Sequence, residues 1–308
     1  MSENKEKHPF RSGFVAVLGR PNVGKSSIIN SLLGEHVAAV SPKPQTTRNA
    51  VRCILSREDW QIVFVDTPGA HKPSHRLGDF MLKEITDALS QVDAVCFVIE
   101  AGDRSVGEKE KILVEALEGV GTPVVLAVNK TDKFPTEDYY LAAAKLYQDL
   151  LKPRAVVPVS AKTGKNLALL EAELAGLLHE QPPIYPEDML MDSTERFLAA
   201  EVIREKIFLA TDEEVPHGVA VVVEEFKSPE EFPELKSCVI RATIIVERPG
   251  QKGIIIGKNG AKLKEIGTAA RKDLEEKFGY PIFLQLWVKI KPGWRKSQDE
   301  LRRLGYGY

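Results

Sequence analysis

Gly19-Arg-Pro-Asn-Val-Gly-Lys-Ser26 is the stretch of the sequence that decides the fold. It matches the phosphate-binding pattern GxxxxGK[ST], in which glycines let successive backbone N–H groups turn inward around phosphate oxygens. The apolar run Phe14–Leu18 before it predicts a strand, and Ser26–Leu33 after it predicts a helix whose N-terminal dipole favours anions. A glycine turn that matches the pattern by chance seldom has a strand directly before it and a helix directly after it. The stretch therefore predicts a phosphate-binding site.

Outward from this loop, the first half of the chain alternates between two kinds of pattern. Strands that alternate with helices predict an α/β fold with a mostly parallel, helix-covered sheet, and such sheets bind ligands at the C-terminal ends of their strands. The apolar, β-branched runs that predict strands are Ile62–Val65, Ala94–Ile99, Val124–Val128 and Val156–Val159. The helical patterns are Lys109–Leu117, Tyr139–Leu151 and Leu167–Leu178.

The sequence Asp66-Thr-Pro-Gly69 ends one of these strands. An acid at that position can hold Mg²⁺ through water, and Gly69 can bring its backbone N–H against the γ-phosphate of a nucleotide. Lys25 would place its ammonium group on the β- and γ-phosphates, and the hydroxyl group of Ser26 would ligate Mg²⁺. The predicted phosphate-binding residues are Gly19, Arg20, Pro21, Asn22, Val23, Gly24, Lys25, Ser26, Ser27 and Gly69.

Asn129-Lys-Thr-Asp132 follows the next-to-last predicted strand. The carboxylate of Asp132 can accept two hydrogen bonds, from the N1–H and the exocyclic amine of guanine, whereas adenine offers no such pair of donors. Ser160-Ala-Lys162 fits a second contact through backbone N–H to the guanine oxygen, although by itself it is typical of a surface loop. The Asn129–Asp132 motif therefore predicts that the domain binds GTP rather than ATP. The predicted guanine-binding residues are Asn129, which would tie the segment to the phosphate loop, Lys130, whose stem would cover the base, Asp132, Ser160, Ala161 and Lys162.

Prolines mark a boundary between two domains. Gln181-Pro-Pro-Ile-Tyr-Pro-Glu187 has three prolines in five residues, which forbids a helix and predicts a stiff linker. We expect an N-terminal tail at 1–12, a nucleotide-binding domain at 13–180, a linker at 181–190, and a second domain with a C-terminal tail at 191–308.

The second domain has a different order of elements. Helix, strand, strand, helix and strand follow one another, which predicts a smaller α+β domain. The expected elements are the helix Glu195–Leu209, the strands Val219–Glu225 and Val239–Val246, the helix Lys262–Lys277 and the strand Ile282–Ile290.

Gly257-Lys-Asn-Gly260 lies between the apolar run Ile254–Ile256, which we expect to end a strand, and the following helix. In a KH domain, a GxxG loop clamps the backbone of about four nucleotides, because glycines permit close approach of the phosphates. Lys258 would supply charge, and the isoleucines would form an apolar groove wall. The predicted RNA-binding residues are Ile256, Gly257, Lys258, Asn259, Gly260 and Lys262.

Charge is distributed unevenly along the chain. The net charge of the whole chain is −2, but residues 241–308 contain 15 Lys and Arg against 7 Asp and Glu. A basic end on an acidic body indicates a polyanionic partner, and this end contains the GxxG loop. Trp294, Tyr306 and Tyr308 could stack on bases, but we expect them to pack the tail onto the domain, since tryptophan is usually a buried anchor.

Other features exclude whole classes of protein. The chain has three cysteines, Cys53, Cys96 and Cys238, which are far apart and form no CxxC pair. They fit a reducing cytosol and argue against a disulfide framework or a structural zinc site. No segment supplies the ~20 apolar residues that a membrane span needs. We expect a cytoplasmic protein, with peripheral contact at the inner face of the cell membrane left open.

Together these motifs resemble the Era family of bacterial ribosome-assembly GTPases. The resemblance runs from about Gly13 to the C-terminus and includes a second domain of the type II KH fold. It implies that Thr46 and Thr47 lie in the first switch, and that Thr47 reaches Mg²⁺ when GTP is bound, with Thr46 as the second choice. The expected Mg²⁺ ligands are Ser26, Thr47 and Asp66. The matching motifs are the phosphate loop, Pro44-Gln-Thr-Thr-Arg48, Asp66–Gly69, Asn129–Asp132 and Ser160–Lys162.

The hydrolysis step departs from the usual GTPase pattern. Many GTPases place a glutamine just after the DxxG motif to orient the attacking water, and this position holds Ala70. The catalytic side chain is therefore unknown, and the resemblance implies slow or assisted hydrolysis. Some relatives use K⁺ held by an asparagine of the phosphate loop. Asn22 holds that position here, and stabilisation of the loop is its alternative role.

The resemblance implies a monomeric GTPase that uses Mg²⁺, binds GTP and GDP, and holds single-stranded RNA, the 3′ end of 16S rRNA, during assembly of the 30S ribosomal subunit. The alternative is a nucleotide-dependent scaffold whose second domain binds protein or a membrane and for which hydrolysis is incidental. The GxxG loop and the basic C-terminal segment favour the RNA-binding interpretation.

Overall fold

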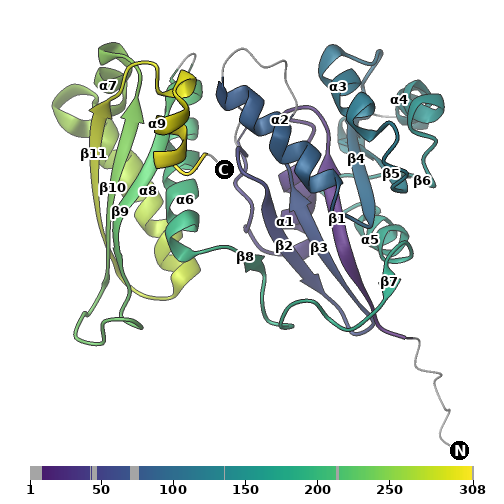
Figure 1. The fold of residues 1–308 in the computed structure, drawn as a ribbon, viewed down its shortest axis with the longest axis horizontal. Coiled ribbons are helices and arrows are strands. Elements are labelled where there is room, and N and C mark those ends of the chain that lie inside the picture. Colours follow the sequence, from purple (N-terminus) through teal and green to yellow (C-terminus); the bar gives the residue numbers. More distant parts are fainter. Residues whose placement is uncertain are drawn as a thin grey trace, which may run out of the picture. The chain divides into compact units, whose positions relative to one another are not determined.

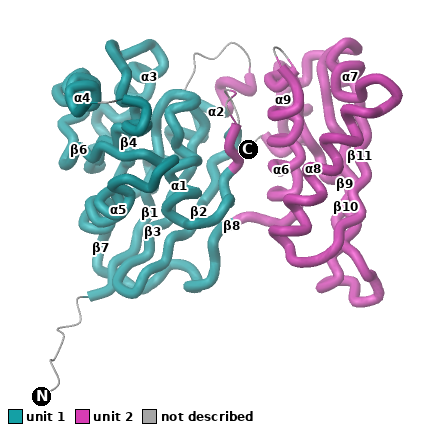
Figure 2. Tube along the Cα trace, turned by 180° about the vertical axis from the view of Figure 1, so that it is seen from behind, with its two compact units in different colours: residues 1–38, 47–72, 81–192 teal, residues 39–46, 73–80, 193–308 magenta. Residues whose placement is uncertain are grey.

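The structure, a computed structural model, describes residues 9–41, 43, 47–69, 76–134, 136–212 and 215–306. The chain forms two compact units (Figure 2). The first comprises residues 1–38, 47–72 and 81–192, and the second comprises residues 193–308 together with 39–46 and 73–80.

The first unit is built on a mostly parallel sheet with the strand order β6-β5-β4-β1-β3-β2-β8 (Figure 1). Strands β1, β3, β4, β5 and β6 run parallel, whereas β2 pairs with β3, and β8 with β2, in antiparallel fashion. The strands are β1 Arg11–Leu18, β2 Val51–Ser56, β3 Trp60–Asp66, β4 Ala94–Glu100, β5 Val124–Asn129, β6 Ala155–Pro158, β7 His179–Glu180 and β8 Met191–Asp192. The predicted α/β fold is confirmed.

Helices cover both faces of this sheet, which explains why its strands read as continuous apolar runs. Apolar residues of α2, α3 and α4 share one core with the side chains of β1, β4 and β5, and α1 and α5 pack together and against β3. The helices are α1 Lys25–Leu33, α2 Arg76–Leu89, α3 Glu108–Leu117, α4 Glu137–Leu151 and α5 Leu167–Ala175.

The proline-rich segment after α5 lies along the first unit. The Gln61 side-chain oxygen accepts the backbone N–H groups of Ile184 and Tyr185 at 2.8 and 2.9 Å. The Ser12 hydroxyl donates to the Pro182 carbonyl at 2.7 Å. Side chains of the first unit thus supply hydrogen-bond partners to a segment whose prolines cannot join a sheet.

The second unit is an α+β domain with a three-stranded sheet in the order β11-β10-β9. Strand β10 runs antiparallel to β9 and parallel to β11. Helices α6 and α8 pack on one face of the sheet, where they bury the alternate residues of each strand. The elements are α6 Glu195–Ala210, β9 Ala220–Lys227, β10 Cys238–Val246, α7 Pro249–Ile256, α8 Ala261–Phe278, β11 Ile282–Ile290 and α9 Gln298–Arg303.

The expectation that Ile254–Ile256 end a strand is wrong, because these residues form the last turn of α7. Pro249 lies in the first turn of this helix, where its missing N–H costs nothing. The Gln251 side-chain oxygen accepts the backbone N–H groups of Glu247 and Arg248 at 2.9 and 3.0 Å. These start signals outweigh the β propensity of three isoleucines in a row.

Several smaller expectations are confirmed. Cys53, Cys96 and Cys238 are free and buried. Trp294 is fully buried, donates its indole N–H to the Gly218 carbonyl at 3.1 Å and stacks on Tyr306. In the described part of the chain, every helix is too short or too polar to span a bilayer.

Candidate nucleotide and RNA sites

The phosphate loop joins β1 to α1 and is held in an unusual backbone conformation. Gly19 and Gly24 have φ of 149° and 100°, and Asn22 has φ of 68°. A Cβ atom at Gly24 would lie 2.3 Å from the side-chain nitrogen of Asn129. Glycine is therefore required at Gly24 both by its φ and by the close approach of the guanine-recognition motif.

Lys25 lies at the centre of this loop, fully enclosed. Its ammonium group donates to the carbonyls of Gly19 and Arg20 at 3.1 and 3.4 Å. Burial lowers the pKa of Lys25 to about 8, and the nearby Asp66 carboxylate opposes the decrease. An anion bound in the loop would favour the charged amine, so the site is suited to phosphate oxygens.

Oxygen atoms of the three predicted Mg²⁺ ligands meet beside Lys25. The hydroxyl groups of Ser26 and Thr47 donate to Oδ2 of Asp66 at 2.7 and 3.2 Å, and the two hydroxyl oxygens are 3.5 Å apart. Oδ1 of Asp66 is buried and has no hydrogen-bond partner among the described residues. A cluster of hydroxyl and carboxylate oxygens with one unsatisfied atom fits Mg²⁺, which prefers such hard ligands.

Three further residues predicted to bind phosphate lie in or against the loop. Gly69 is buried against the loop, where a Cβ atom would lie 2.8 Å from Pro21. Val23 is fully buried, and its carbonyl accepts the Asn129 amide at 2.8 Å. Ser27 is half-buried in the first turn of α1.

The predicted guanine-binding residues come together at the ends of β5 and β6. The Ser160 hydroxyl donates to Oδ1 of Asp132 at 2.6 Å, and the Ala161 backbone N–H donates to the Asn129 side-chain oxygen at 3.1 Å. Asp132 itself is exposed. The Ser160 bond sets the orientation of the exposed Asp132 carboxylate. Lys162 follows as an exposed residue.

Lys130 connects the guanine motif to the phosphate loop. Its backbone is left-handed, with φ of 64°. Its ammonium group donates to the Asn22 carbonyl at 2.6 Å and pairs with Glu100 at 2.9 Å. The stem of Lys130 therefore spans from the guanine motif to the phosphate loop.

An acidic cluster that the sequence analysis missed supports this arrangement. Arg20 pairs with Asp103, Glu110 and Glu100 at 2.6, 2.9 and 3.5 Å. Burial opposes the charged form of Arg20, but the hydrogen bond and charge of Asp103, with the other two carboxylates, keep its pKa above the ordinary value. Glu100 ends β4 at the edge where ligands bind, and that position was the signal available in the sequence.

Three residues considered in the sequence analysis lie outside the described residues. They are Thr46, the second choice for the Mg²⁺ ligand, Ala70, which replaces the usual glutamine, and Tyr308; Pro44 and Gln45 of the first-switch motif lie outside them as well.

The GxxG loop in the second unit is a tight connection between α7 and α8. Gly257, Asn259 and Gly260 all have positive φ, at 69°, 52° and 78°. A Cβ atom at Gly257 would lie 2.7 Å from that of Lys262. Lys258 and Asn259 are exposed. The loop thus presents a charged and an amide side chain between two glycines, as binding to a phosphate backbone requires.

The flanks of the loop are less uniform. Ile256 is half-buried, whereas Ile254 is 53% exposed and Ile255 is fully buried. Lys262 is half-buried and pairs with Glu265 at 3.2 Å. Two of the three isoleucines can therefore contribute to an apolar wall, and Ile255 belongs to the core.

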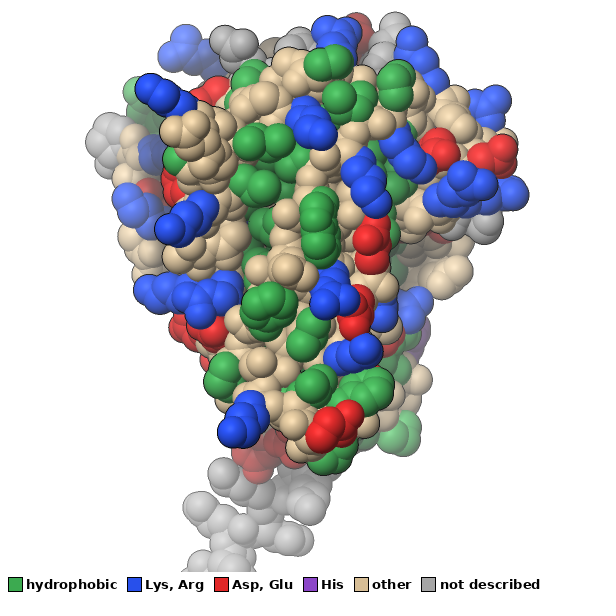
Figure 3. Space-filling model, turned by 90° about the vertical axis from the view of Figure 1, so that its left-hand side faces the viewer, with side chains coloured by type: hydrophobic (Ala, Val, Ile, Leu, Met, Phe, Trp, Pro, Cys, Tyr) green, Lys and Arg blue, Asp and Glu red, His purple; other side chains and the backbone are tan. Residues whose placement is uncertain are grey.

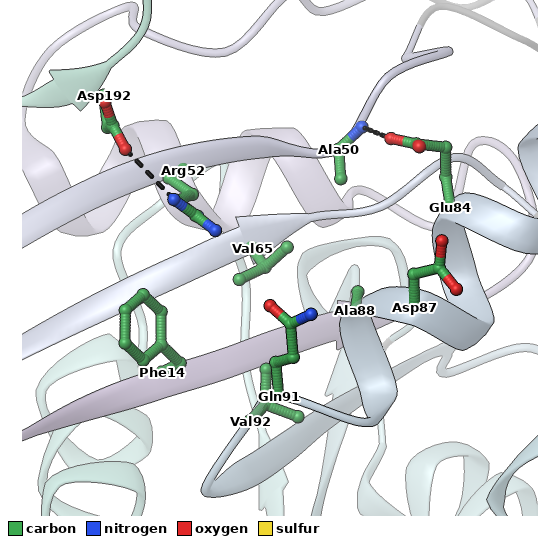
Figure 4. A pocket seen from close by; sticks show the side chains of 10 residues that line it. All are labelled: Phe14, Ala50, Arg52, Val65, Glu84, Asp87, Ala88, Gln91, Val92 and Asp192. Atoms are coloured by element: carbon green, nitrogen blue, oxygen red, sulfur yellow. Dashed lines mark hydrogen bonds and ion pairs between the residues drawn. The ribbon is translucent and has the colours of Figure 1, made fainter. Parts of the chain in front are cut away.

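A separate hollow of about 340 Å³ lies in the first unit between α2 and strands β1 to β3 (Figure 4). Arg52 on β2 pairs with Asp192 on the neighbouring strand β8 at 3.2 Å, and its guanidinium carbon lies 5.7 Å from the Phe14 ring centroid. Glu84 accepts the Ala50 backbone N–H at 2.9 Å. Its charged groups thus have partners within the protein, and none of its lining residues belongs to the nucleotide site.

The fold and these two sites define a P-loop GTPase joined to a KH domain. Residues 14–130 match the family described as 50S ribosome-binding GTPase, and residues 214–295 match the KH domain family. The chain belongs to the GTPase Era family. It is 45% identical to GTPase Era of Alkaliphilus oremlandii over 96% of this chain and 99% of the relative. It is 47% identical to GTPase Era of Caldanaerobacter subterraneus subsp. tengcongensis over 96% of this chain and 98% of the relative.

Solved structures agree with this assignment. An Era variant from Aquifex aeolicus bound to GDP and AlF4⁻ is 38% identical, with a TM-score of 0.90 over 97% of this chain and 100% of that one. An Era in complex with MgGDPNP and nucleotides 1506–1542 of 16S ribosomal RNA is also 38% identical, with a TM-score of 0.91 over the same shares.

Proposed function

We propose that this GTPase binds the 3′ end of 16S rRNA through its KH domain and acts in assembly of the 30S ribosomal subunit in the cytoplasm. The observation that carries the proposal is one chain with both a guanine-nucleotide site and a GxxG loop of KH geometry. The similar Era with both MgGDPNP and a 16S rRNA fragment supports it.

On this proposal, five described residues of the nucleotide site take part in GTP hydrolysis. Lys25 would exchange its loop carbonyls for the β- and γ-phosphate oxygens, and Gly69 would donate its N–H to the γ-phosphate. Ser26, Thr47 and Asp66 would hold Mg²⁺, which neutralises charge that develops on the phosphates. Thr47 belongs to a switch segment, so loss of the γ-phosphate would release it.

We also propose that Asn22 supports a K⁺ ion beside the phosphates. Asn22 is an exposed oxygen-bearing residue of the phosphate loop, has φ of 68°, and accepts the Lys130 ammonium group at its carbonyl. Replacing K⁺ by Na⁺ at constant ionic strength should slow GTP hydrolysis about fivefold or more, or ~1 kcal/mol of barrier. Asn22→Ala should erase the difference between the salts. Equal rates of the wild-type protein in K⁺ and Na⁺ would remove the ion from the mechanism.

The RNA function is tested by crosslinking the protein to RNA in cells and sequencing the RNA that copurifies. Reads should concentrate at the 3′ end of 16S rRNA and fall to background after ribonuclease treatment. A scaffold whose second domain binds protein or a membrane would instead copurify ribonuclease-resistant partners. Sedimentation of the same lysates should place the protein with free 30S subunits, and purified protein should sediment as a monomer.

A further inference from the structure

Two large aromatic side chains are exposed on one face of the KH sheet. Phe283 and Trp287, on β11, are 49% and 43% exposed. They are four residues apart on the same strand, so both point to the same face, roughly 13 Å apart along it. Exposed aromatic side chains that share a face are uncommon on a small domain and mark interaction sites.

This face is the one that the helices of the domain leave open. Helices α7 and α8 both pack against β11, and α8 does so on the opposite face, where Leu286 approaches Gly267. The side chains of Val239, Arg241 and Thr243 lie opposite Phe283, Gln285 and Trp287 in the register of β10 and β11. The open face therefore continues from β11 across β10.

Polar side chains separate the two aromatic residues. Arg241 donates to the Gln285 side-chain oxygen at 3.0 Å and pairs with Glu225 at 2.6 Å. On the other side of Gln285, the Thr243 hydroxyl and Lys289 ammonium both donate to Glu224, at 2.7 and 3.3 Å. The face thus combines stacking surfaces with hydrogen-bonding groups held in fixed positions.

The part of the chain that contains β11 is basic, with 15 Lys and Arg against 7 Asp and Glu in residues 241–308. Figure 3 views the molecule from the side on which β11 and α7 lie in Figure 1, and it shows a band of hydrophobic side chains with more Lys and Arg than Asp and Glu around it. A second protein copy would favour an apolar patch with few charges at its centre. Aromatic side chains flanked by cations favour a nucleic-acid strand.

We propose that Phe283 and Trp287 form a stacking platform for bases of the single-stranded RNA that the GxxG loop holds. The GxxG loop connects α7 to α8, and both helices flank β11, which is an edge strand. A strand of RNA that leaves the loop over this edge reaches the open face directly. Sheet-borne aromatic residues that stack two or three bases are an established mode of RNA recognition. The inference rests on the RNA-binding function proposed above.

Tryptophan fluorescence reports on this platform directly. Trp294 is fully buried and Trp60 is half-buried in the first unit, whereas Trp287 is exposed. Titration with a single-stranded RNA of about twelve nucleotides should quench the emission, because a base stacks on the indole ring. Trp287→Thr should abolish the quenching, since threonine keeps the β propensity of the strand but offers no ring. Absence of quenching with RNA fully bound would overturn the platform.

RNA affinities measured with a long and a short RNA distinguish the contribution of the platform from that of the GxxG loop. The variant Phe283→Thr with Trp287→Thr should bind the twelve-nucleotide RNA about 10- to 100-fold more weakly and a four-nucleotide RNA with unchanged affinity. The salt dependence of binding should keep its slope, because stacking releases no counterions. Tyr139→Ala, which removes an aromatic residue that is 42% exposed on α4, is the matched control and should change neither affinity.

The outcomes distinguish the two proposals. If wild-type protein binds neither RNA, the proposed RNA function fails. If wild-type protein binds and the double variant binds the long RNA equally well, or loses the short RNA to the same extent, the platform alone is overturned. Quenching that depends on protein concentration without RNA would show that a second copy covers the face, and it would also overturn the platform.

Discussion

Asp132→Asn should change the nucleotide that this GTPase binds more tightly from GTP to xanthosine triphosphate. The Ser160 hydroxyl already donates to Oδ1 of Asp132 at 2.6 Å, and an asparagine oxygen can keep that bond. The new amide NH₂ would replace the carboxylate oxygen that accepts the exocyclic amine of guanine. It would meet that amine donor to donor, whereas xanthine offers an oxygen at the same position and the asparagine oxygen can still accept N1–H. GTP affinity should fall about 100- to 10,000-fold, or ~3–5 kcal/mol.

The measurement is competition of both nucleotides against a fluorescent GDP analogue and a fluorescent xanthosine diphosphate analogue. Asp149→Asn, the same chemical change at an exposed residue of α4, is the control and should leave both affinities unchanged. An Asp132→Asn variant that still binds GTP more tightly than xanthosine triphosphate would show that the Asn129–Asp132 motif does not recognise the base.

Replacing Lys258 and Asn259 together by aspartate should reduce RNA affinity by one to two orders of magnitude, or roughly 1.4–2.8 kcal/mol. Two carboxylates would lie where the loop brings phosphates close, and the Lys258 contact would be lost. The fold should be spared, because both side chains are exposed and aspartate tolerates the left-handed conformation of Asn259, whose φ is 52°. GTP affinity should not change, since the nucleotide site is built from other residues.

Fluorescence anisotropy with a short single-stranded RNA at several salt concentrations checks this result. Wild-type affinity should decrease as salt rises, and loss of one phosphate contact should flatten the slope by about 0.7. The variant Lys145→Asp with Gln148→Asp, on exposed positions of α4, makes the same change in net charge far from the loop in sequence. Equal RNA affinity of the loop variant and the wild type, with native circular dichroism, would show that the GxxG loop does not hold the RNA and would favour the scaffold.

The strands of the nucleotide-binding unit were predictable because each is a buried apolar run, and the motifs that follow them have fixed spacing. The phosphate loop, Asp66 and Asn129 could all be identified from those two signals. Strand β2 and helix α2 were not predicted, although β2 begins three positions after the Pro44–Arg48 motif. Helix α7 was taken for a strand because β-branched isoleucines dominate its last turn.

Side-chain partners were harder to predict than elements. Glu100 meets Arg20 and Lys130 from positions 80 and 30 residues away in sequence, and such pairs depend on the register of neighbouring strands. The same holds for the Ser160 bond to Asp132, which sets the orientation of a carboxylate that the motif already identified. The sequence indicates which groups act on the ligand, and the sheet decides which groups hold them in place.

The contact between Val23 and Asn129 has a consequence for the protein during its own synthesis. The two residues are separated by 106 positions, and a ribosome needs roughly 5–20 s to add that many residues at ~5–20 per second. A nascent chain that has emerged only through β4 carries the complete phosphate loop but lacks the side chain that fastens it. We therefore expect GTP to bind stably only after β5 has joined the sheet. A lack of GTP would then lower the stability of the folded protein, but it would not block the first steps in folding of its core.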